Sequence, residues 1–252
     1  PHMIYTQTLE KLRTLRLDGM AQGLEEQRQQ SNVLKLDFEE RLALLVERQW
    51  TWKENRAMTA RLKRAQFKIS TACIEDIDYA PHRGLKRAQI EQLRAGEWVQ
   101  NHRNCLIIGP TGIGKTYLGC ALGVQACRDG FKAVYFTAPK LFRALQQAQA
   151  DGSLTKLLKT IQKARLFVVD DLGVAAVGAK QYRDLLEIID DRCGHGSTLI
   201  TSQYPVEQWH EVIGAATVAD AILDRLVHNA YRLDLSGESI RKLKNSIPQK
   251  TS

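Results

Sequence analysis

Apolar residues recur at two different spacings along the 252-residue chain, and the change between them divides the sequence in two. Over residues 6–68 the apolar positions follow one face of a helix. The clearest run is Phe38, Leu42, Leu45, Val46 and Trp50. Residues 1–70 are therefore predicted to form a small all-helical domain, in which residues 1–2 look like an expression remnant before Met3.

Two local signals refine the helical part. Asp18-Gly19 is expected to break the first amphipathic stretch. Asp37 with Glu40 three residues later is the spacing of a cap that starts a helix. Residues 72–84 include Pro81 and Gly84 and are interpreted as a linker, so that residues 71–252 form the second domain.

In the second domain short apolar runs alternate with longer helical patterns. The expected strands and helices are Asn104–Ile108, Thr116–Arg128, Lys132–Thr137, Pro139–Ala150, Ser153–Lys163, Leu166–Asp170, Lys180–Cys193 and Ser197–Ser202. Strands joined by helices of about ten residues or more require crossover connections, which predict an α/β fold with a parallel sheet flanked by helices.

Composition and charge narrow the class of partner. The net charge of +8 favours polyanions, nucleic acid above all. Between residues 53 and 68 six basic side chains face a single acidic one, Glu54, and the pattern suggests phosphate binding, although an ordinary solvated helix face is the alternative. These candidate DNA-binding residues are Lys53, Arg56, Arg61, Lys63, Arg64 and Lys68.

The expected location is the cytoplasm, without membrane contact. The apolar runs fall short of the roughly 18 residues that a membrane-spanning helix needs. The cysteines are odd in number and include no C-x-x-C pair, which favours a reducing compartment.

The most specific motif follows the first apolar strand of the second domain. It reads Gly109, Pro110, Thr111, Gly112, Ile113, Gly114, Lys115 and Thr116, the full G-x-x-x-x-G-K-[ST] pattern. Glycines let the backbone turn its N–H groups onto phosphate oxygens, while Lys115 reaches the terminal phosphates and the Thr116 hydroxyl binds Mg²⁺. The motif predicts a site for a nucleoside triphosphate and Mg²⁺.

Two further strands end in polar residues that fit the same site. Asp170 and Asp171 close the run Leu166–Asp170, where Asp170 is expected to complete the magnesium site and Asp171 to polarise the attacking water. The strand Ser197–Ser202 ends in candidates for contact with the γ-phosphate. Ser202 is favoured there, with Thr201, Gln203 and plain strand-end capping as alternatives.

These motifs in this order resemble the AAA+ family of ATPases. In that resemblance Asp170 corresponds to the Walker B aspartate, although glutamate is common at the position of Asp171. Arg225 resembles the arginine finger that reaches a neighbouring subunit's nucleotide, with an intrahelical pair to Asp220 or Asp224 as the alternative. Arg241 resembles the sensor II arginine. Few residues follow it, so no C-terminal lid domain is expected.

Longer strings carry a narrower resemblance. They are 73–79 (CIEDIDY), 198–203 (TLITSQ) and 221–230 (AILDRLVHNA), beside the phosphate loop. The chain resembles the IstB-type helper ATPases of insertion sequences, which implies an ATP-regulated homo-oligomer on double-stranded DNA that selects target sites and stimulates a transposase. A DnaC-like helicase loader is the alternative. A metabolic P-loop kinase is a third class, but no acceptor pocket is recognisable for it.

Overall fold

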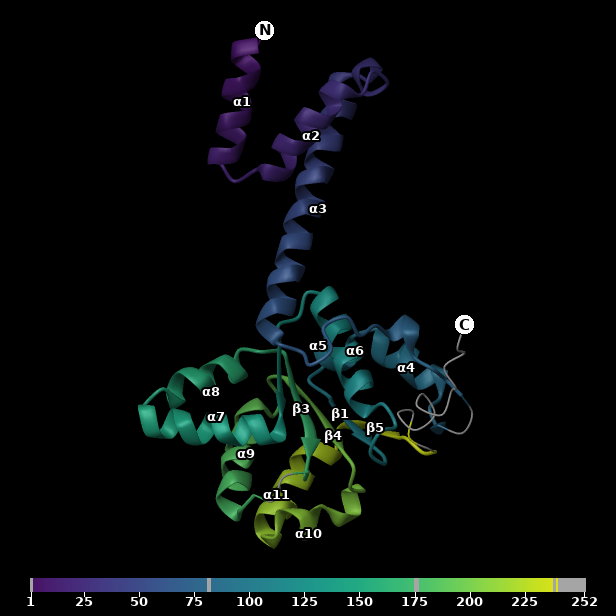
Figure 1. Ribbon diagram of the computed structural model, residues 1–252, viewed down its shortest axis with the longest axis vertical. Coiled ribbons are helices and arrows are strands. Elements are labelled where there is room, and N and C mark those ends of the chain that lie inside the picture. Colours follow the sequence, from purple (N-terminus) through teal and green to yellow (C-terminus); the bar gives the residue numbers. More distant parts are fainter. Residues whose placement is uncertain (1, 81–82, 175–176, 238, 240–252) are drawn as a thin grey trace, which may run out of the picture. The chain divides into compact units, whose positions relative to one another are not determined.

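The computed structural model describes residues 2–80, 83–174, 177–237 and 239. The chain divides into two compact units, Pro1–Ala60 and Arg61–Ser252 (Figure 1). The predicted division after residue 70 thus falls inside the second unit. In the described ranges, no helix combines the length and the apolar composition that crossing a bilayer requires.

The N-terminal unit is helical, as its periodicity predicts. Its elements are α1 (His2–Thr14), α2 (Asp18–Gln29), the 3₁₀ turn η1 (Val33–Lys35) and the first part of α3 (Phe38–Ala65). The chain turns at residues 15–17, where Arg16 has a φ of 59°. Asp18 and Gly19 therefore begin α2 instead of breaking a helix. A Cβ at Gly19 would lie 2.8 Å from the Gln49 Cα, so the missing side chain permits close packing of α2 on α3.

The predicted cap at the start of α3 is present, whereas the apolar side chains of the helix are mostly exposed. The predicted cap is confirmed, because Asp37 Oδ1 accepts a hydrogen bond from the Glu40 amide at 2.8 Å and Glu40 Oε2 accepts one from the Asp37 amide. The predicted buried face is largely exposed within this unit, however. Phe38 is 75% and Trp50 65% exposed. Helical periodicity alone does not say whether a partner element covers the apolar face.

The C-terminal unit contains a parallel five-stranded sheet, as the alternation of strands and helices predicts. Its strands are β1 (Asn104–Ile108), β2 (Ala133–Thr137), β3 (Leu166–Leu172), β4 (Ser197–Ser202) and β5 (Ala230–Asp234), in the order β2-β3-β4-β1-β5. All four neighbouring pairs are parallel. The edge strand β5 was not predicted.

Helices cover both faces of this sheet. They are α4 (Arg87–Arg94), α5 (Glu97–Gln100), α6 (Lys115–Arg128), α7 (Ala138–Asp151), α8 (Leu154–Gln162), α9 (Ala179–Arg192), α10 (Trp209–Ile213) and α11 (Ala216–Val227), with short 3₁₀ turns η2 (Ile74–Asp76) and η4 (Val206–Gln208). One apolar cluster packs α6 against the sheet, and the other packs α7, α9 and α11 against the opposite face. The central strands are consequently buried on both sides, which explains their unbroken apolar runs.

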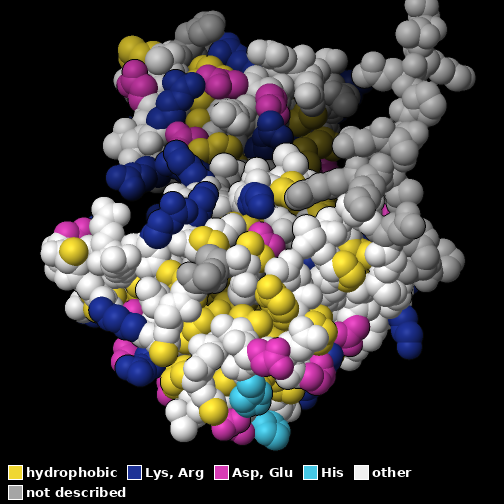
Figure 2. Space-filling view, turned by 60° about the horizontal axis from the view of Figure 1, so that its bottom comes forward, with side chains coloured by type: hydrophobic (Ala, Val, Ile, Leu, Met, Phe, Trp, Pro, Cys, Tyr) yellow, Lys and Arg dark blue, Asp and Glu magenta, His cyan; other side chains and the backbone are white. Residues whose placement is uncertain are grey.

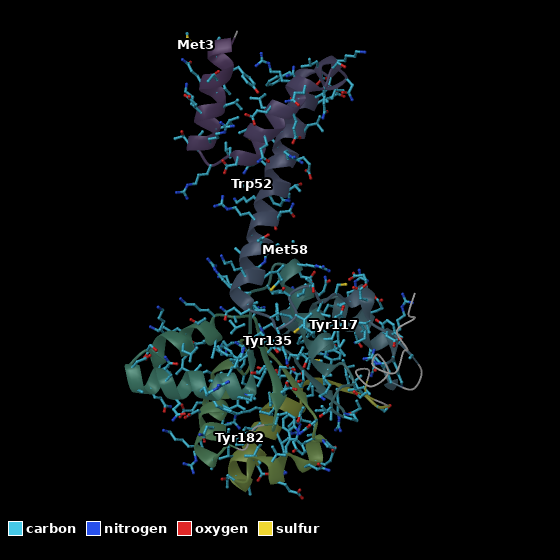
Figure 3. All side chains as sticks on the ribbon, in the orientation of Figure 1. Met3, Trp52, Met58, Tyr117, Tyr135 and Tyr182 are labelled. Carbon is cyan, nitrogen blue, oxygen red and sulfur yellow. The ribbon has the colours of Figure 1, made fainter. Side chains whose placement is uncertain are left out.

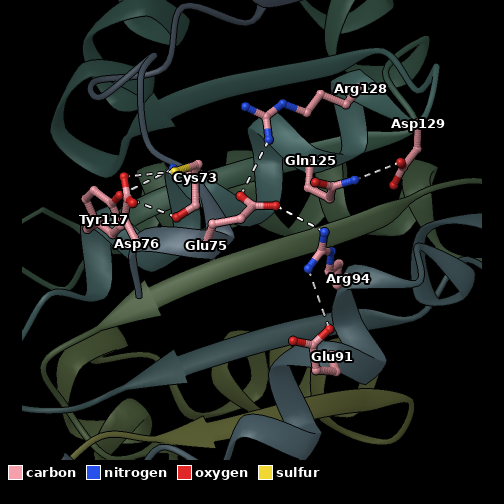
Figure 4. Close-up of polar contacts among 9 residues, drawn as sticks. All are labelled: Cys73, Glu75, Asp76, Glu91, Arg94, Tyr117, Gln125, Arg128 and Asp129. Atoms are coloured by element: carbon pink, nitrogen blue, oxygen red, sulfur yellow. Dashed lines mark hydrogen bonds and ion pairs between the residues drawn. The ribbon is translucent and has the colours of Figure 1, made fainter. Parts of the chain in front are cut away.

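The segment predicted to be a linker is part of the core. Ala72 and Ile74 are 0% and 2% exposed. The Tyr117 hydroxyl lies 3.3 Å from both the amide and the carbonyl of Cys73 (Figure 4). Glu75 pairs with Arg94 and Arg128, at 3.1 and 3.7 Å. These contacts tie the segment to α4 and α6, so that it forms one wall of the site described below.

Candidate nucleotide site

The phosphate loop lies where the sequence places it, between β1 and α6. Gly112 and Gly114 have φ values of 84° and 96°, which side-chain-bearing residues rarely adopt. Gly109 has a different reason, since a Cβ there would lie 2.6 Å from the Leu235 carbonyl oxygen. The loop leads directly into α6, whose first backbone N–H groups and positive dipole end favour a bound anion.

Lys115, the first residue of α6, is 6% exposed and donates a hydrogen bond to the Pro110 carbonyl at 2.8 Å. Burial lowers the pKa of its ammonium group, and the charges of Asp171 and Asp170 oppose that shift. Two acids thus flank the cation, as a site that holds both phosphate and a metal requires.

Asp170 is fully buried and accepts hydrogen bonds from three hydroxyl groups. Thr116 lies 3.2 and 3.0 Å from its two oxygens, Thr201 lies 2.6 Å from Oδ1, and Tyr135 lies 2.7 Å from Oδ2. Burial raises the pKa of the Tyr135 phenol, and the hydrogen bond to Asp170 raises it further. Three side chains, from β2, β4 and α6, therefore meet around the carboxylate of Asp170 on β3.

Asp171 has a left-handed backbone, with a φ of 61°. The register between β3 and β4 shifts between Val169 and Leu172, so the strand bulges at this residue. Its amide donates to the Thr201 hydroxyl at 2.9 Å. The bulge brings the second acid to the wall of the cavity described below, beside the first.

The three candidates at the end of β4 have different surroundings. The Thr201 hydroxyl accepts a hydrogen bond from the Asp171 backbone amide and donates one to the Asp170 carboxylate. Ser202, which was favoured, is 1% exposed and donates to the Leu172 carbonyl at 2.9 Å, so its side chain joins the ends of β4 and β3. Gln203 accepts a hydrogen bond from the Thr111 hydroxyl at 2.7 Å and so lies against the phosphate loop.

A cavity of about 750 Å³ joins these groups. Its polar end includes Thr111, Lys115, Thr116, Asp171 and Gln203, and its apolar end includes Ile69, Ile77, Leu85 and Tyr117. A polar end beside an apolar one suits a nucleotide, with phosphates at the loop and the base between apolar side chains. The apolar wall was missed in the sequence because residues 72–84 resemble a linker, although Ile74 and Ile77 repeat there as core residues do.

Arg83 is a further residue that sequence reasoning missed. It is 5% exposed, lines the cavity and donates to the carbonyl oxygens of Asp78 and Ile113. Its Nε has no hydrogen-bond partner among the described residues. Arg83 thereby ties the phosphate loop to the segment that forms the apolar wall.

The donors present fit Mg²⁺. Thr116 and Asp170 supply oxygen atoms beside the phosphate loop, and no cluster of three or more His, Cys, Asp or Glu ligands occurs among the described residues. Mg²⁺ needs no such cluster, because it commonly binds through one or two protein oxygens together with substrate phosphates and water.

Arg225 lies outside this cavity. The Asn104 side chain, at the start of β1, donates to the carbonyl oxygens of Arg225 and Leu226 at 3.1 and 3.3 Å. The phosphate loop follows the other end of β1, roughly 13 Å away at about 3.3 Å per residue. The Arg225 guanidinium pairs with Asp190 and with the Ala221 carbonyl, and not with Asp220 or Asp224. Arg241 lies outside the described residues.

The six candidate DNA-binding residues fall into different environments. Arg61 donates to the Cys127 carbonyl at the end of α6. Arg56 lies 4.0 Å from Asp18 and 5.1 Å from the Trp52 ring, and Lys68 lines the nucleotide cavity. Lys53, Lys63 and Arg64 are exposed. Lys53 and Arg56 belong to the N-terminal unit and the others to the C-terminal unit, so the structure does not make them one surface.

Comparisons with known proteins agree with this geometry. An insertion sequence ATP-binding protein of Sinorhizobium fredii, y4pL, is 46% identical over 240 residues, which is 95% of this chain and 98% of the relative. The IS1162 ATP-binding protein of Pseudomonas fluorescens is 42% identical over 81% of this chain and 88% of its own length.

Among solved structures, DnaI superposes with a TM-score of 0.56 at 21% identity and covers 66% of this chain and 92% of its own, a likeness of fold. The model of the family described as IstB-like ATP binding protein matches residues 10–247. With the phosphate loop, the paired acids and the nucleotide-sized cavity in place, the chain belongs to this IstB-like family of ATP-binding proteins.

Proposed function

We propose that this protein hydrolyses ATP with Mg²⁺ and uses the nucleotide state to assemble on duplex DNA, select target sites and stimulate the transposase of its insertion sequence. The observation that carries the proposal is the cavity beside the phosphate loop, which Lys115, Thr116 and Asp171 line and behind which the buried Asp170 is hydrogen-bonded to Thr116. The names of the relatives support the link to insertion sequences.

The residues of the cavity divide the chemistry among them. Lys115 and the backbone N–H groups of the loop neutralise the terminal phosphates, while Thr116 and Asp170 would hold a Mg²⁺ ion, which would supply further positive charge to them. Asp171 polarises the attacking water. Gln203 contacts the γ-phosphate in this proposal, which its hydrogen bond to Thr111 of the phosphate loop supports.

Arg225 acts in a neighbouring subunit in this proposal. Its place near the start of β1 separates it from its own phosphate loop, as a residue that completes another copy's site requires. Arg225→Ala is expected to abolish ATP-dependent assembly while leaving nucleotide binding by the single chain intact. Sedimentation with a non-hydrolysable ATP analogue measures both.

Asp190→Asn is the matched control for Arg225, since it removes the ion pair and keeps the arginine. If Arg225 only braces α11 against α9, the two variants will behave alike. If Arg225 serves the neighbouring site, Asp190→Asn retains assembly. Monomeric wild-type protein on DNA with ATP would count against the whole proposal.

Basic side chains outside the cavity supply the DNA contacts. On the face in Figure 2, Lys and Arg side chains gather in several groups among acidic and hydrophobic side chains. One group that the sequence analysis overlooked consists of Lys156 and Lys159 on α8 and Lys163 directly after it, which follow one face at helical spacing and line a surface hollow of about 450 Å³. These lysines join Lys63 and Arg64 as proposed phosphate contacts.

The test is fluorescence anisotropy of duplex and single-stranded DNA with ATP, ADP and no nucleotide across a salt series. Replacing Lys156, Lys159 and Lys163 by Ala is expected to flatten the logarithmic salt dependence by up to about 3, at roughly 0.9 per phosphate contact. A Lys132→Ala/Lys180→Ala variant, also at exposed lysines, is the control. Preference for single strands, or binding that ignores the nucleotide, would instead favour a helicase loader.

A further inference from the structure

The carboxylate of Asp170 has more hydrogen-bond donors than the phosphate-loop motif accounts for. Thr116 comes from the motif itself. Thr201 and Tyr135 come from the two strands that flank β3, namely β4 and β2, and they reach different oxygens of the carboxylate. Asp170 is thus held from both sides by groups that are independent of the phosphate loop.

Strand register explains how Tyr135 reaches Asp170. Thr137 is the direct partner of Asp170 in the β2–β3 ladder, and Tyr135 lies two residues earlier on β2. Such diagonal neighbours on one face of a sheet are about 7–8 Å apart at the backbone, within the reach of a long aromatic side chain. Tyr135 and Val168 both belong to the cluster that faces α6, the same face as Asp170.

Packing alone does not require a tyrosine at this position. The ring of Tyr135 is 7% exposed and meets Phe67 edge to face, with centroids 5.9 Å apart. A phenylalanine would make the same ring contact without burying a hydroxyl group, which is costly unless it is hydrogen-bonded. The hydroxyl donates to a buried carboxylate at 2.7 Å, which is a charge-assisted bond.

We propose that Tyr135 is a positioning residue for the metal-binding carboxylate. It fixes Asp170 Oδ2, as Thr201 fixes Oδ1, so that the carboxylate keeps its orientation when Thr116 turns from Asp170 to the metal ion. The inference rests on the proposed Mg²⁺-ATP site. Partners of this kind, one shell behind a ligand, typically change metal affinity about 10- to 100-fold.

The experiment measures Mg²⁺-dependent binding of a fluorescent, non-hydrolysable ATP analogue, so the result does not depend on turnover. Tyr135→Phe is expected to raise the half-saturating Mg²⁺ concentration roughly 10-fold or more. Its affinity for the analogue in EDTA should stay within about 2-fold of wild type, because the phosphate loop is untouched. Thr201→Val, which removes the second donor, should shift the Mg²⁺ requirement in the same direction.

The chain offers a closely matched control in Tyr182, which lies in the other apolar cluster (Figure 3). It is 1% exposed and meets Phe142 edge to face at 5.8 Å. Tyr182→Phe therefore removes a tyrosine hydroxyl from the cluster on the opposite face of the sheet, and its Mg²⁺ requirement should match wild type.

Two results would overturn the role of Tyr135. One is an unchanged Mg²⁺ requirement in Tyr135→Phe. The other is an equal loss of affinity with Mg²⁺ and in EDTA, which would mean that the tyrosine only supports the fold of the cavity. A wild-type protein that binds the analogue without any help from Mg²⁺ would instead contradict the proposed function itself.

Discussion

The left-handed backbone of Asp171 gives a reason for aspartate at a position where many AAA+ proteins have glutamate. A φ of 61° strains most side-chain-bearing residues by about 1–2 kcal/mol, whereas Asp and Asn tolerate it because their short polar side chains bond locally. Asp171→Asn should therefore change the free energy of unfolding by less than about 0.5 kcal/mol. Asp171→Glu should lower it by about 1 kcal/mol.

The two variants should also differ in catalysis. Asp171→Asn removes the charge that polarises water, so ATP hydrolysis should fall by about 10²–10⁴-fold while nucleotide affinity is retained. Asp171→Glu keeps the negative charge but carries it on a longer side chain, attached to a strained backbone. ATP hydrolysis should therefore fall less in Asp171→Glu than in Asp171→Asn. Phosphate release, analogue binding and urea unfolding measure the three quantities. A glutamate variant as stable and as active as wild type would refute the reasoning.

Two further predictions concern stability. A Cβ at Gly123 would meet the Phe67 ring, with Cζ at 2.6 Å, so Gly123→Ala should lower the free energy of unfolding by up to about 2 kcal/mol, after the roughly 1 kcal/mol gained from helix propensity. Gly119→Ala is the control on the same helix and should be nearly neutral, because the nearest contact of its Cβ is at 3.3 Å. Equal urea midpoints for the two variants would contradict this prediction. Burial, then the charge of Arg165, lowers the pKa of His102, so the unfolded state takes up the proton first and stability should fall as pH drops below about 6.5. His102→Asn, which suits the φ of 56°, should flatten that acid limb in urea unfolding at different pH values, and an unchanged slope would assign the loss to other groups.

The sheet and the phosphate loop were predictable because their physical causes are local. Parallel strands buried on both faces need continuous apolar runs, and residues 166–169 at the start of β3 are such a run. The edge strand β5 lacks this signal, since only Leu233 among its residues is buried. The same limit applies to α3, where Phe38 and Trp50 repeat correctly but remain exposed in their unit.

The finer arrangement of the site depended on contacts distant in sequence. Three polar residues end β4, and the string TLITSQ cannot say which of them faces the acids. The bulge at Asp171 and the partners of Thr201 decide this, and both depend on how β3 pairs with β4. Arg83 and Tyr135 were missed for a similar reason, because each acts through a residue at least 30 positions away.

The contacts of Phe67 bear on how relatives could exchange their N-terminal modules. Its ring lies where a side chain at Gly123 would be, and it meets the Tyr135 ring edge to face. Ala65 is buried in the same apolar cluster. A gene fusion joined at residue 71 would leave these core groups behind and open the helix that follows the phosphate loop to solvent. Recombination that preserves these contacts of the nucleotide-binding unit must therefore cut before Ala65, and the second compact unit itself begins at Arg61.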